Sequence, residues 1–170
     1  MTEPLKFSIK EISDEYENFT IEIHNLLKYQ KLSLSEIEAQ IMIIKGLIET
    51  AVQLDDVRND DGELTIQIFI EQKSVTVEVR KQVSQSSYVM LEELDKAIQW
   101  IRGHQSPLDP YITEFKEISS KSHKGQTIAH GLAKLAYETE AVLDFYVTES
   151  SILNLSAIRY LERKKRKIND

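Results

Sequence analysis

Several residue types that carry chemistry are absent or scarce in this chain of 170 residues. It has no cysteine, which excludes disulfides, thiolate zinc sites and a cysteine nucleophile. It has five glycines and three prolines, so little material exists for a glycine-rich loop that holds phosphate. No apolar run approaches the roughly 20 residues that span a bilayer, and the N-terminus lacks a signal-peptide pattern. These absences predict a cytoplasmic protein without a membrane segment.

The charge balance also excludes a class of partner. Lys and Arg number 21 against 28 Asp and Glu, and the formal net charge of −7 argues against a nucleic-acid-binding surface. Hydrophobic residues make up 41% of the chain, enough to bury a core. The length suits one domain. We therefore predict a single domain over residues 1–161 and a basic tail over residues 162–170, with no nucleic-acid or membrane partner.

Hydrophobic periodicity predicts a strand and two helices in the first third of the chain. Leu5, Phe7 and Ile9 alternate with polar residues, as in a half-buried strand. Apolar residues at helical spacing then predict one helix over residues 14–27 and a second over residues 35–52. We place the capping box of the second helix at its first residues, Ser35-Glu36-Ile37-Glu38.

The remainder of the chain predicts two strand pairs separated by helices. Alternating residues over 64–70 and 75–80 indicate an antiparallel hairpin. A helix from Ser87 ends at Gly103, Asp109-Pro110 opens a short helix, and a further helix surrounds residues 128–135. Two strands near residues 141–148 and 152–160 complete the order. This order predicts an α+β two-layer sandwich, in which a mixed, mostly antiparallel sheet of about five strands carries helices on one face.

Three short segments add a family resemblance to this order. They are Leu32-Ser33-Leu34-Ser35-Glu36, Thr50-Ala51-Val52 and His130-Gly131-Leu132-Ala133-Lys134-Leu135. Together with the element order, they resemble the histidine kinase-like ATPase fold (the GHKL or Bergerat fold), and most of all its anti-sigma-factor serine kinase branch. In that family the last segment is a glycine box in which a helix N-terminus receives phosphate. The resemblance covers nearly the whole chain and lies more in element order than in motifs.

The resemblance implies a nucleotide site whose main positions are substituted here. The family needs a Glu that polarises the attacking group and, four residues later, an Asn that holds magnesium. The matching positions are Gly46 and Thr50. Lys81 stands where an Asp accepts the adenine amino group, and Val83 replaces a glycine that lets the backbone approach the base. Gly131 is retained. We therefore expect a scaffold without ATP or magnesium, and no catalytic residue, cofactor or metal.

These observations predict a non-catalytic regulatory module, either anti-sigma-factor-like or a pseudokinase, that works through protein–protein contact. The resemblance implies a sigma factor or another regulator as partner, and a homodimer formed by the first strand and first helix. Our candidate interface residues are Phe7, Phe19, Ile23 and Trp100. For Trp100, an aromatic anchor for a partner competes with burial under its own helix.

Two other functions stay open. The domain could bind a nucleotide in an altered way through Glu49, Thr50 and the helix start at His130-Gly131, as an atypical nucleotide-binding protein or serine kinase. Alternatively, it could be a structural homo-oligomer.

The remaining polar clusters favour ordinary roles. The acidic residues within 55–61 indicate a solvated turn, because a calcium loop would put Val57 and Ile68 where carboxylates are needed. The four histidines lack metal-ligand spacing. Residues 119–125 indicate a polar loop at the place of the family's lid, and the basic tail indicates a solubilising end, with attraction of an acidic partner as the alternative.

Overall fold

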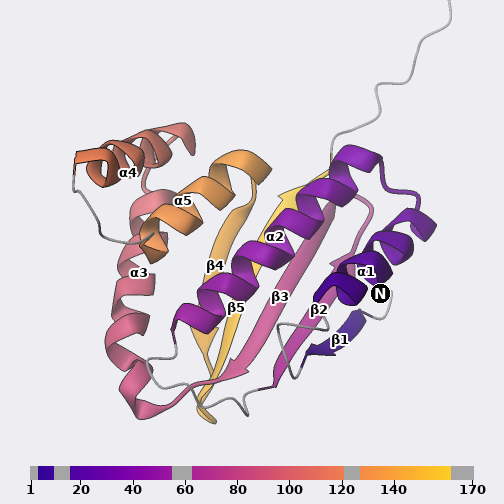
Figure 1. The fold of residues 1–170 in the computed structure, drawn as a ribbon, viewed down its shortest axis with the longest axis horizontal. Coiled ribbons are helices and arrows are strands. Elements are labelled where there is room, and N and C mark those ends of the chain that lie inside the picture. The colour runs from indigo at the N-terminus through magenta and orange to yellow at the C-terminus, as the bar shows by residue number, and fades with distance from the viewer. Residues whose placement is uncertain (1–3, 10–15, 55–62, 121–126, 162–170) are drawn as a thin grey trace, which may run out of the picture.

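The computed structural model describes residues 4–9, 16–54, 63–120 and 127–161. Its elements follow one another as in Figure 1: β1 (Leu5–Ile9), α1 (Tyr16–Tyr29), α2 (Leu34–Gln53), β2 (Leu64–Ile70), β3 (Ser74–Gln82), a 3-10 turn η1 (Gln85–Ser87), α3 (Tyr88–Arg102), α4 (Leu108–Ser120), α5 (Ile128–Thr139), β4 (Val142–Val147) and β5 (Ile152–Tyr160).

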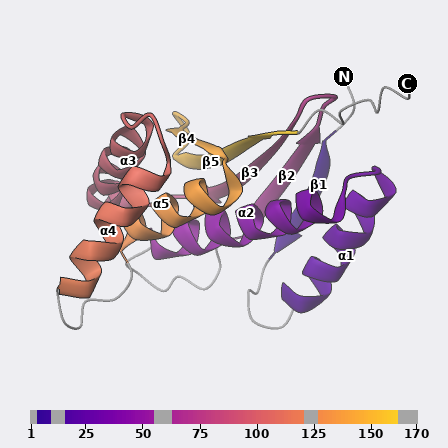
Figure 2. The same ribbon diagram turned by 90° about the horizontal axis from the view of Figure 1, so that it is seen from above.

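The five described strands form one sheet in the order β1-β2-β3-β5-β4. Every pairing between the described strands is antiparallel, whereas we expected a mixed, mostly antiparallel sheet. Helix α2 crosses the middle of one face, with α1 and α5 on either side of it (Figures 1 and 2). Helix α3 lies at the β4 edge, and α4 packs on α5. This confirms the predicted α+β two-layer fold.

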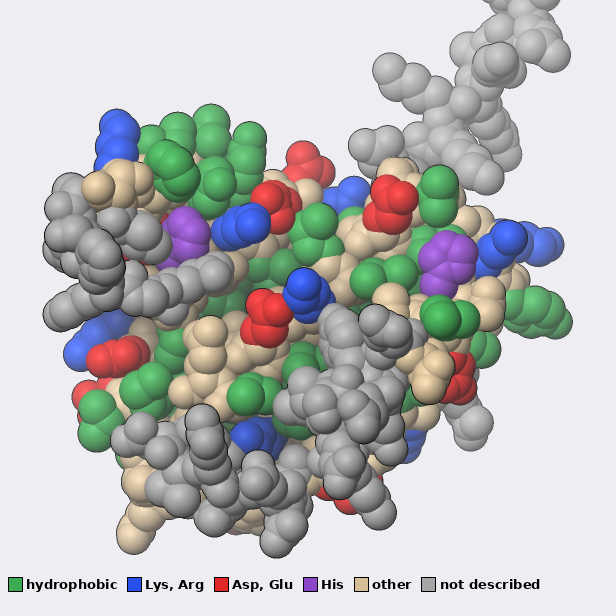
Figure 3. Space-filling model, in the orientation of Figure 1, with side chains coloured by type: hydrophobic (Ala, Val, Ile, Leu, Met, Phe, Trp, Pro, Cys, Tyr) green, Lys and Arg blue, Asp and Glu red, His purple; other side chains and the backbone are tan. Residues whose placement is uncertain are grey.

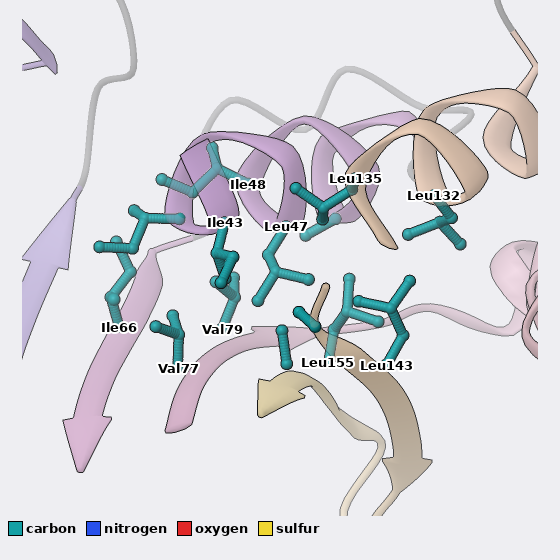
Figure 4. Close-up of a cluster of buried hydrophobic side chains, with 14 of the residues drawn as sticks. Ile43, Leu47, Ile48, Ile66, Val77, Val79, Leu132, Leu135, Leu143 and Leu155 are labelled. Atoms are coloured by element: carbon teal, nitrogen blue, oxygen red, sulfur yellow. The ribbon is translucent and has the colours of Figure 1, made fainter. Parts of the chain in front are cut away.

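The core lies between this helix layer and the sheet. Alternate residues of β2 and β3, such as Ile66, Val77 and Val79, point toward the helices and are fully buried (Figure 4). Ile43 and Leu47 of α2 meet them from above. Burying one such side chain contributes roughly 1.5–3 kcal/mol, so this layer holds α2 firmly against the sheet.

The helix ends agree with the predictions to within a few residues. The capping box of α2 is formed by Ser33 and Glu36, two residues before the one that we placed at Ser35. Ser33 Oγ accepts from Glu36 N at 3.3 Å, and Ser33 N donates to Glu36 Oε2 at 2.8 Å. Helix α4 begins at Leu108, before the expected Asp109-Pro110 start. Gly103 ends α3 as predicted.

Some predictions lie partly or wholly outside the described residues. These include the acidic turn, the basic tail and most of the polar loop that we expected from residue 119. Ser119 itself belongs to α4, where its hydroxyl donates to Phe115 O at 2.8 Å. The buried hydrophobic side chains form one core, and the assignment of residues 1–161 to one domain stays a prediction. None of the described helices combines the length and apolarity needed to cross a membrane.

Candidate functional site

A groove runs between α2 and α5 on the helix side of the molecule. Its volume is about 580 Å³, within the range of about 300–1,000 Å³ that is typical of ligand pockets. Ile41, Met42 and Leu135 supply apolar surface to it, and Met42 is 40% exposed. Figure 3 looks onto this side, where charged side chains of both signs lie over the two helices. The groove therefore combines apolar surface with a charged rim.

The contact between the two helices depends on Gly46. A Cβ at this position would lie 2.9 Å from Leu135 Cδ2 and 3.0 Å from Leu135 Cδ1. Any larger residue would have to displace the Leu135 side chain or separate the helices. Glycine therefore stands at position 46 for a packing reason, and it also lines the groove.

Thr50 lies one turn after Gly46 and also lines the groove. Its hydroxyl donates to the Gly46 carbonyl at 2.8 Å, and the residue is buried. Such a bond back to the preceding turn is common for threonine within helices. The hydroxyl proton of Thr50 is therefore used inside α2.

Two ion pairs border the groove. Lys45 Nζ lies 3.9 Å from Glu49 Oε1 on α2, and Lys134 Nζ lies 3.9 Å from Glu138 Oε1 on α5. All four side chains are partly exposed, and such i,i+4 pairs contribute about 0.3–0.5 kcal/mol each. Pairs this weak can exchange partners when a charged ligand or protein arrives.

The groove also brings together two residues that our alignment to the family did not combine. Glu49 and Gln53 both line it, four residues apart on α2. A Glu followed four residues later by an amide side chain is the pattern that the resemblance requires, with Gln in place of Asn. It lies three residues after the predicted pair, Gly46 and Thr50. Residues three apart share a helix face, so both alignments point to the same groove. The pattern is present in the sequence, with glutamine in place of the asparagine that the resemblance implies.

The other two positions of the nucleotide site that the resemblance implies lie elsewhere in the structure. Lys81 and Val83 are both buried and neither lines the groove. Lys81 follows Val79 by two residues in β3, so it lies on the helix-covered face of the sheet. Val83 N donates to Ser151 O at 2.9 Å. The structure thus brings Gly46, Thr50 and Gly131 to one groove and leaves Lys81 and Val83 outside it.

The start of α5 lies beside the groove. Thr127 caps the helix, and its Oγ1 accepts from His130 N at 3.1 Å. Gly131 lines the groove, whereas the His130 ring lies 6.1 Å from Tyr111 of α4. Tyr111 also stacks on Tyr137 of α5 at 5.0 Å between ring centroids. Aromatic contacts therefore attach α4 to the helix that forms one wall of the groove.

Two of the four candidate interface residues belong to the core. Phe19 is 8% exposed and Ile23 is 1% exposed, so their burial removes them from the surface of the single chain. Helix α1 exposes Ile21 and Tyr29 instead. The sequence could not separate these faces, because apolar residues occur on both sides of this helix.

The other two candidates are half-buried. The Phe7 ring meets Phe19 edge-on, with 5.5 Å between centroids. Trp100 packs against His104 at 5.1 Å, and His104 Nδ1 lies 2.8 Å from the Trp100 carbonyl. An interface role for Phe7 and Trp100 stays a prediction.

The described residues contain no group of three His, Asp or Glu that could hold a metal ion. Glu49 and Gln53 offer one carboxylate and one amide oxygen on the same side of α2. Magnesium bound with a nucleotide often takes only one or two protein ligands and keeps several waters, so two oxygen-bearing side chains are the number that such an ion needs from a chain.

No protein-family model matches the chain, and no curated protein matches its sequence. Its structure is similar to a chain from the crystal structure of the SiaB-SiaC complex from Pseudomonas aeruginosa, with a TM-score of 0.59 and 13% sequence identity. The similarity covers 92% of this chain and 89% of that chain. At this identity the likeness establishes a shared fold over nearly the whole length of both chains.

Proposed function

We propose that this chain is a non-catalytic regulatory protein that acts by binding another protein. The observation that carries the proposal is the fold likeness to a chain from the SiaB-SiaC complex, which extends over about nine-tenths of each chain. A domain of this fold is thus found in a protein–protein assembly. The resemblance to anti-sigma-factor kinases adds a class of partner, a sigma factor or one of its regulators, and an ATPase-like scaffold.

The groove between α2 and α5 supports this proposal as the contact surface. Protein interfaces place apolar side chains at their centre and polar ones around them. Met42, an exposed residue, lies in the groove with Ile41 and Leu135, and the two lysine–glutamate pairs border it. A partner segment with an apolar side chain and flanking charges of both signs suits this arrangement.

The absence of catalysis is part of the proposal. Gly46 and Thr50 cannot act as general base and metal ligand in the family's manner, and the Thr50 hydroxyl is bonded within its own helix.

Affinity purification from the source cells tests the protein-binding function. We expect the tagged chain to enrich a specific protein over a tag-only control. The groove variant Met42→Glu should reduce that enrichment at least several-fold, because a charge would enter the apolar centre. Val89→Glu, at an exposed position of α3, is the matched control and should retain the partner. A chain that enriches no protein would contradict the proposal, and equal capture by both variants would move the contact away from the groove.

Glu49 and Gln53 favour a second candidate function, binding of a magnesium nucleotide in the same groove. In this alternative Glu49 and Gln53 would hold the metal ion through a carboxylate and an amide oxygen, and Lys45 and Lys134 would compensate phosphate charge. The bound nucleotide supplies a transferable phosphoryl group. An atypical serine kinase would be the result.

Thermal unfolding with Mg-ATP and Mg-ADP separates the two candidates. A ligand at 100 times its Kd stabilises a folded protein by about 2.7 kcal/mol, which corresponds to a shift of several degrees in Tm. The first proposal expects no shift. A shift that Thr50→Arg and Gln53→Ala both abolish, and that Val89→Glu preserves, would establish the second candidate instead.

A further inference from the structure

The second face of the sheet is uncovered by any described helix (Figure 2). Antiparallel sheets can leave one face in water when that face is polar. Here Phe69, Ile158 and Val142 lie on it in a single row, because Phe69 pairs with Thr76, Thr76 with Ile158, and Ile158 with Val142. The side chain of Val142 is exposed. These three residues form an apolar row within a face whose other positions are mostly polar, including Ser8, Thr65 and Arg80.

A second row on this face carries opposite charges at its two ends. The pairings run from Lys6 through Gln67, Glu78 and Ser156 to Asp144, so one residue of each strand takes part. Lys6 belongs to the edge strand β1 and Asp144 to the opposite edge strand β4, and both are exposed, although the Asp144 carboxylate also contacts Arg102 of its own chain. Each edge lies two strands, or roughly 10 Å, from the central strand β3.

We propose that this face packs against the same face of a second copy of the chain. A two-fold axis that runs along β3 between the copies places β1 of each over β4 of the other. Lys6 of one copy then lies across from Asp144 of the other, and this pair occurs twice. Phe69 meets Ile158 of the other copy in the same way. The face is thus complementary to itself in charge and in apolar surface, as an interface with two-fold symmetry requires.

The charged pair nearest the axis is compatible with this packing. Arg80 Nη2 donates to Glu78 Oε2 at 2.8 Å, so the charges nearest the axis are already neutralised within each chain. Stacked sheets cross at about −30°, which displaces the ends of the rows by a few ångström, within reach of a lysine side chain. Asn154, which pairs with Arg80 across the sheet, has an amide oxygen without a hydrogen-bond partner among the described residues.

This face is opposite to the groove, so the dimer leaves the groove open to a partner. It also differs from the dimer through the first strand and first helix that the family resemblance implies. The inference is therefore independent of the proposed function, and the two can fail separately.

Light scattering coupled to size exclusion, together with sedimentation over a concentration series, tests the proposal. We expect wild-type chain at twice the 19.7 kDa of one copy. Lys6→Glu and Asp144→Lys should each weaken the dimer roughly tenfold or more, because each puts two like-charged pairs in the interface. A 1:1 mixture of the two variants should recover the dimer, because the mixed pair restores opposite charges at both ends.

The mixture is the decisive measurement, since Asp144 also pairs with Arg102 of its own chain at 3.2 Å and its substitution affects the monomer as well. Ile158→Arg should abolish the dimer, and Ile21→Glu, at an exposed position of α1, should leave it intact. The proposal is overturned by a wild-type chain that stays monomeric, by a mixture that fails to recover, or by a dimer that Ile21→Glu dissociates and Ile158→Arg does not.

Discussion

Gly46 of α2 faces Leu135 of α5 so closely that a methyl group on residue 46 would lie 2.9 Å from Leu135 Cδ2. The two residues share the groove that we propose as the functional site. Their contact sets how near the two helices come, and so the width of the groove. Position 46 is also where the family resemblance requires a glutamate, which could not fit here without moving Leu135.

This contact predicts that the effect of Gly46→Ala depends on residue 135. Alanine gains up to about 1 kcal/mol of helix propensity over glycine, but its methyl group strains against Leu135. We expect a change within about 1 kcal/mol in the wild type and a clear stabilisation in the Leu135→Ala background. Urea unfolding of the four proteins in this double-mutant cycle measures the free energy of unfolding of each and so the coupling between the two positions. Equal effects in both backgrounds would mean that the contact has no energetic role.

The cap of α2 gives a second prediction. Ser33→Ala removes an oxygen that accepts from Glu36 N, and it should lower the free energy of unfolding by about 1 kcal/mol. Ser35→Ala is the matched control, since Ser35 contributes no cap and should cost much less. Urea unfolding compares the two. A larger loss for Ser35→Ala would show instead that Ser35 caps the helix, as the sequence pattern predicts.

The end of α5 gives a third prediction. Glu140 follows the helix with a φ of 53°, a left-handed conformation that favours glycine. Glu140→Gly should raise the free energy of unfolding by about 0.5–1 kcal/mol. The substitution also removes the ion pair between Glu140 and Arg159 at 3.9 Å, which is weak because the Glu140 side chain is exposed. Glu140→Ala loses the same contact without the backbone gain, so this control should show no stabilisation in thermal unfolding.

The attachment of α4 gives a fourth prediction. The helix packs on α5, where Tyr111 stacks on Tyr137. Tyr111→Ala should therefore increase hydrogen exchange in α4 while the central strands β3 and β5 keep their protection. Tyr88→Ala, at an exposed position of α3, is the control. Uniform loss of protection across the sheet would show that α4 and the core unfold together.

Local patterns were sufficient for most elements. The alternation in β2 and β3 and the glycine after α3 each predicted a structure that is observed, because burial of one face and the end of a helix depend on neighbouring residues. The cap of α2 was misplaced because Ser33 and Ser35 both precede apolar residues, and only the bond to Glu36 distinguishes them. Phe19 and Ile23 were named as interface candidates but are buried in the single chain, because periodicity does not say which apolar face is covered.

Three positions that the family resemblance singled out lie together in the candidate groove. Gly46, Thr50 and Gly131 line one groove although the last is far along the chain from the first two, and the family resemblance had brought them together. Gln53 was missed because it differs from the expected asparagine. The resemblance also placed Lys81 and Val83 at the site, but neither lines the groove, although strand alternation puts Lys81 on the helix-covered face of the sheet.

By itself, the sequence determined the classes of site that this chain does not contain, such as thiolate chemistry, and the helices and strands whose periodicity is local. Only the tertiary structure decided that β5 lies between β3 and β4 and that Gly46 packs against Leu135. It also decided that Lys6 and Asp144 lie at the two ends of one cross-strand row of the sheet. The physical reason is the range of the interactions. Helix and strand patterns depend on neighbouring residues, whereas a groove or a sheet row depends on packing between distant segments, which no local pattern records.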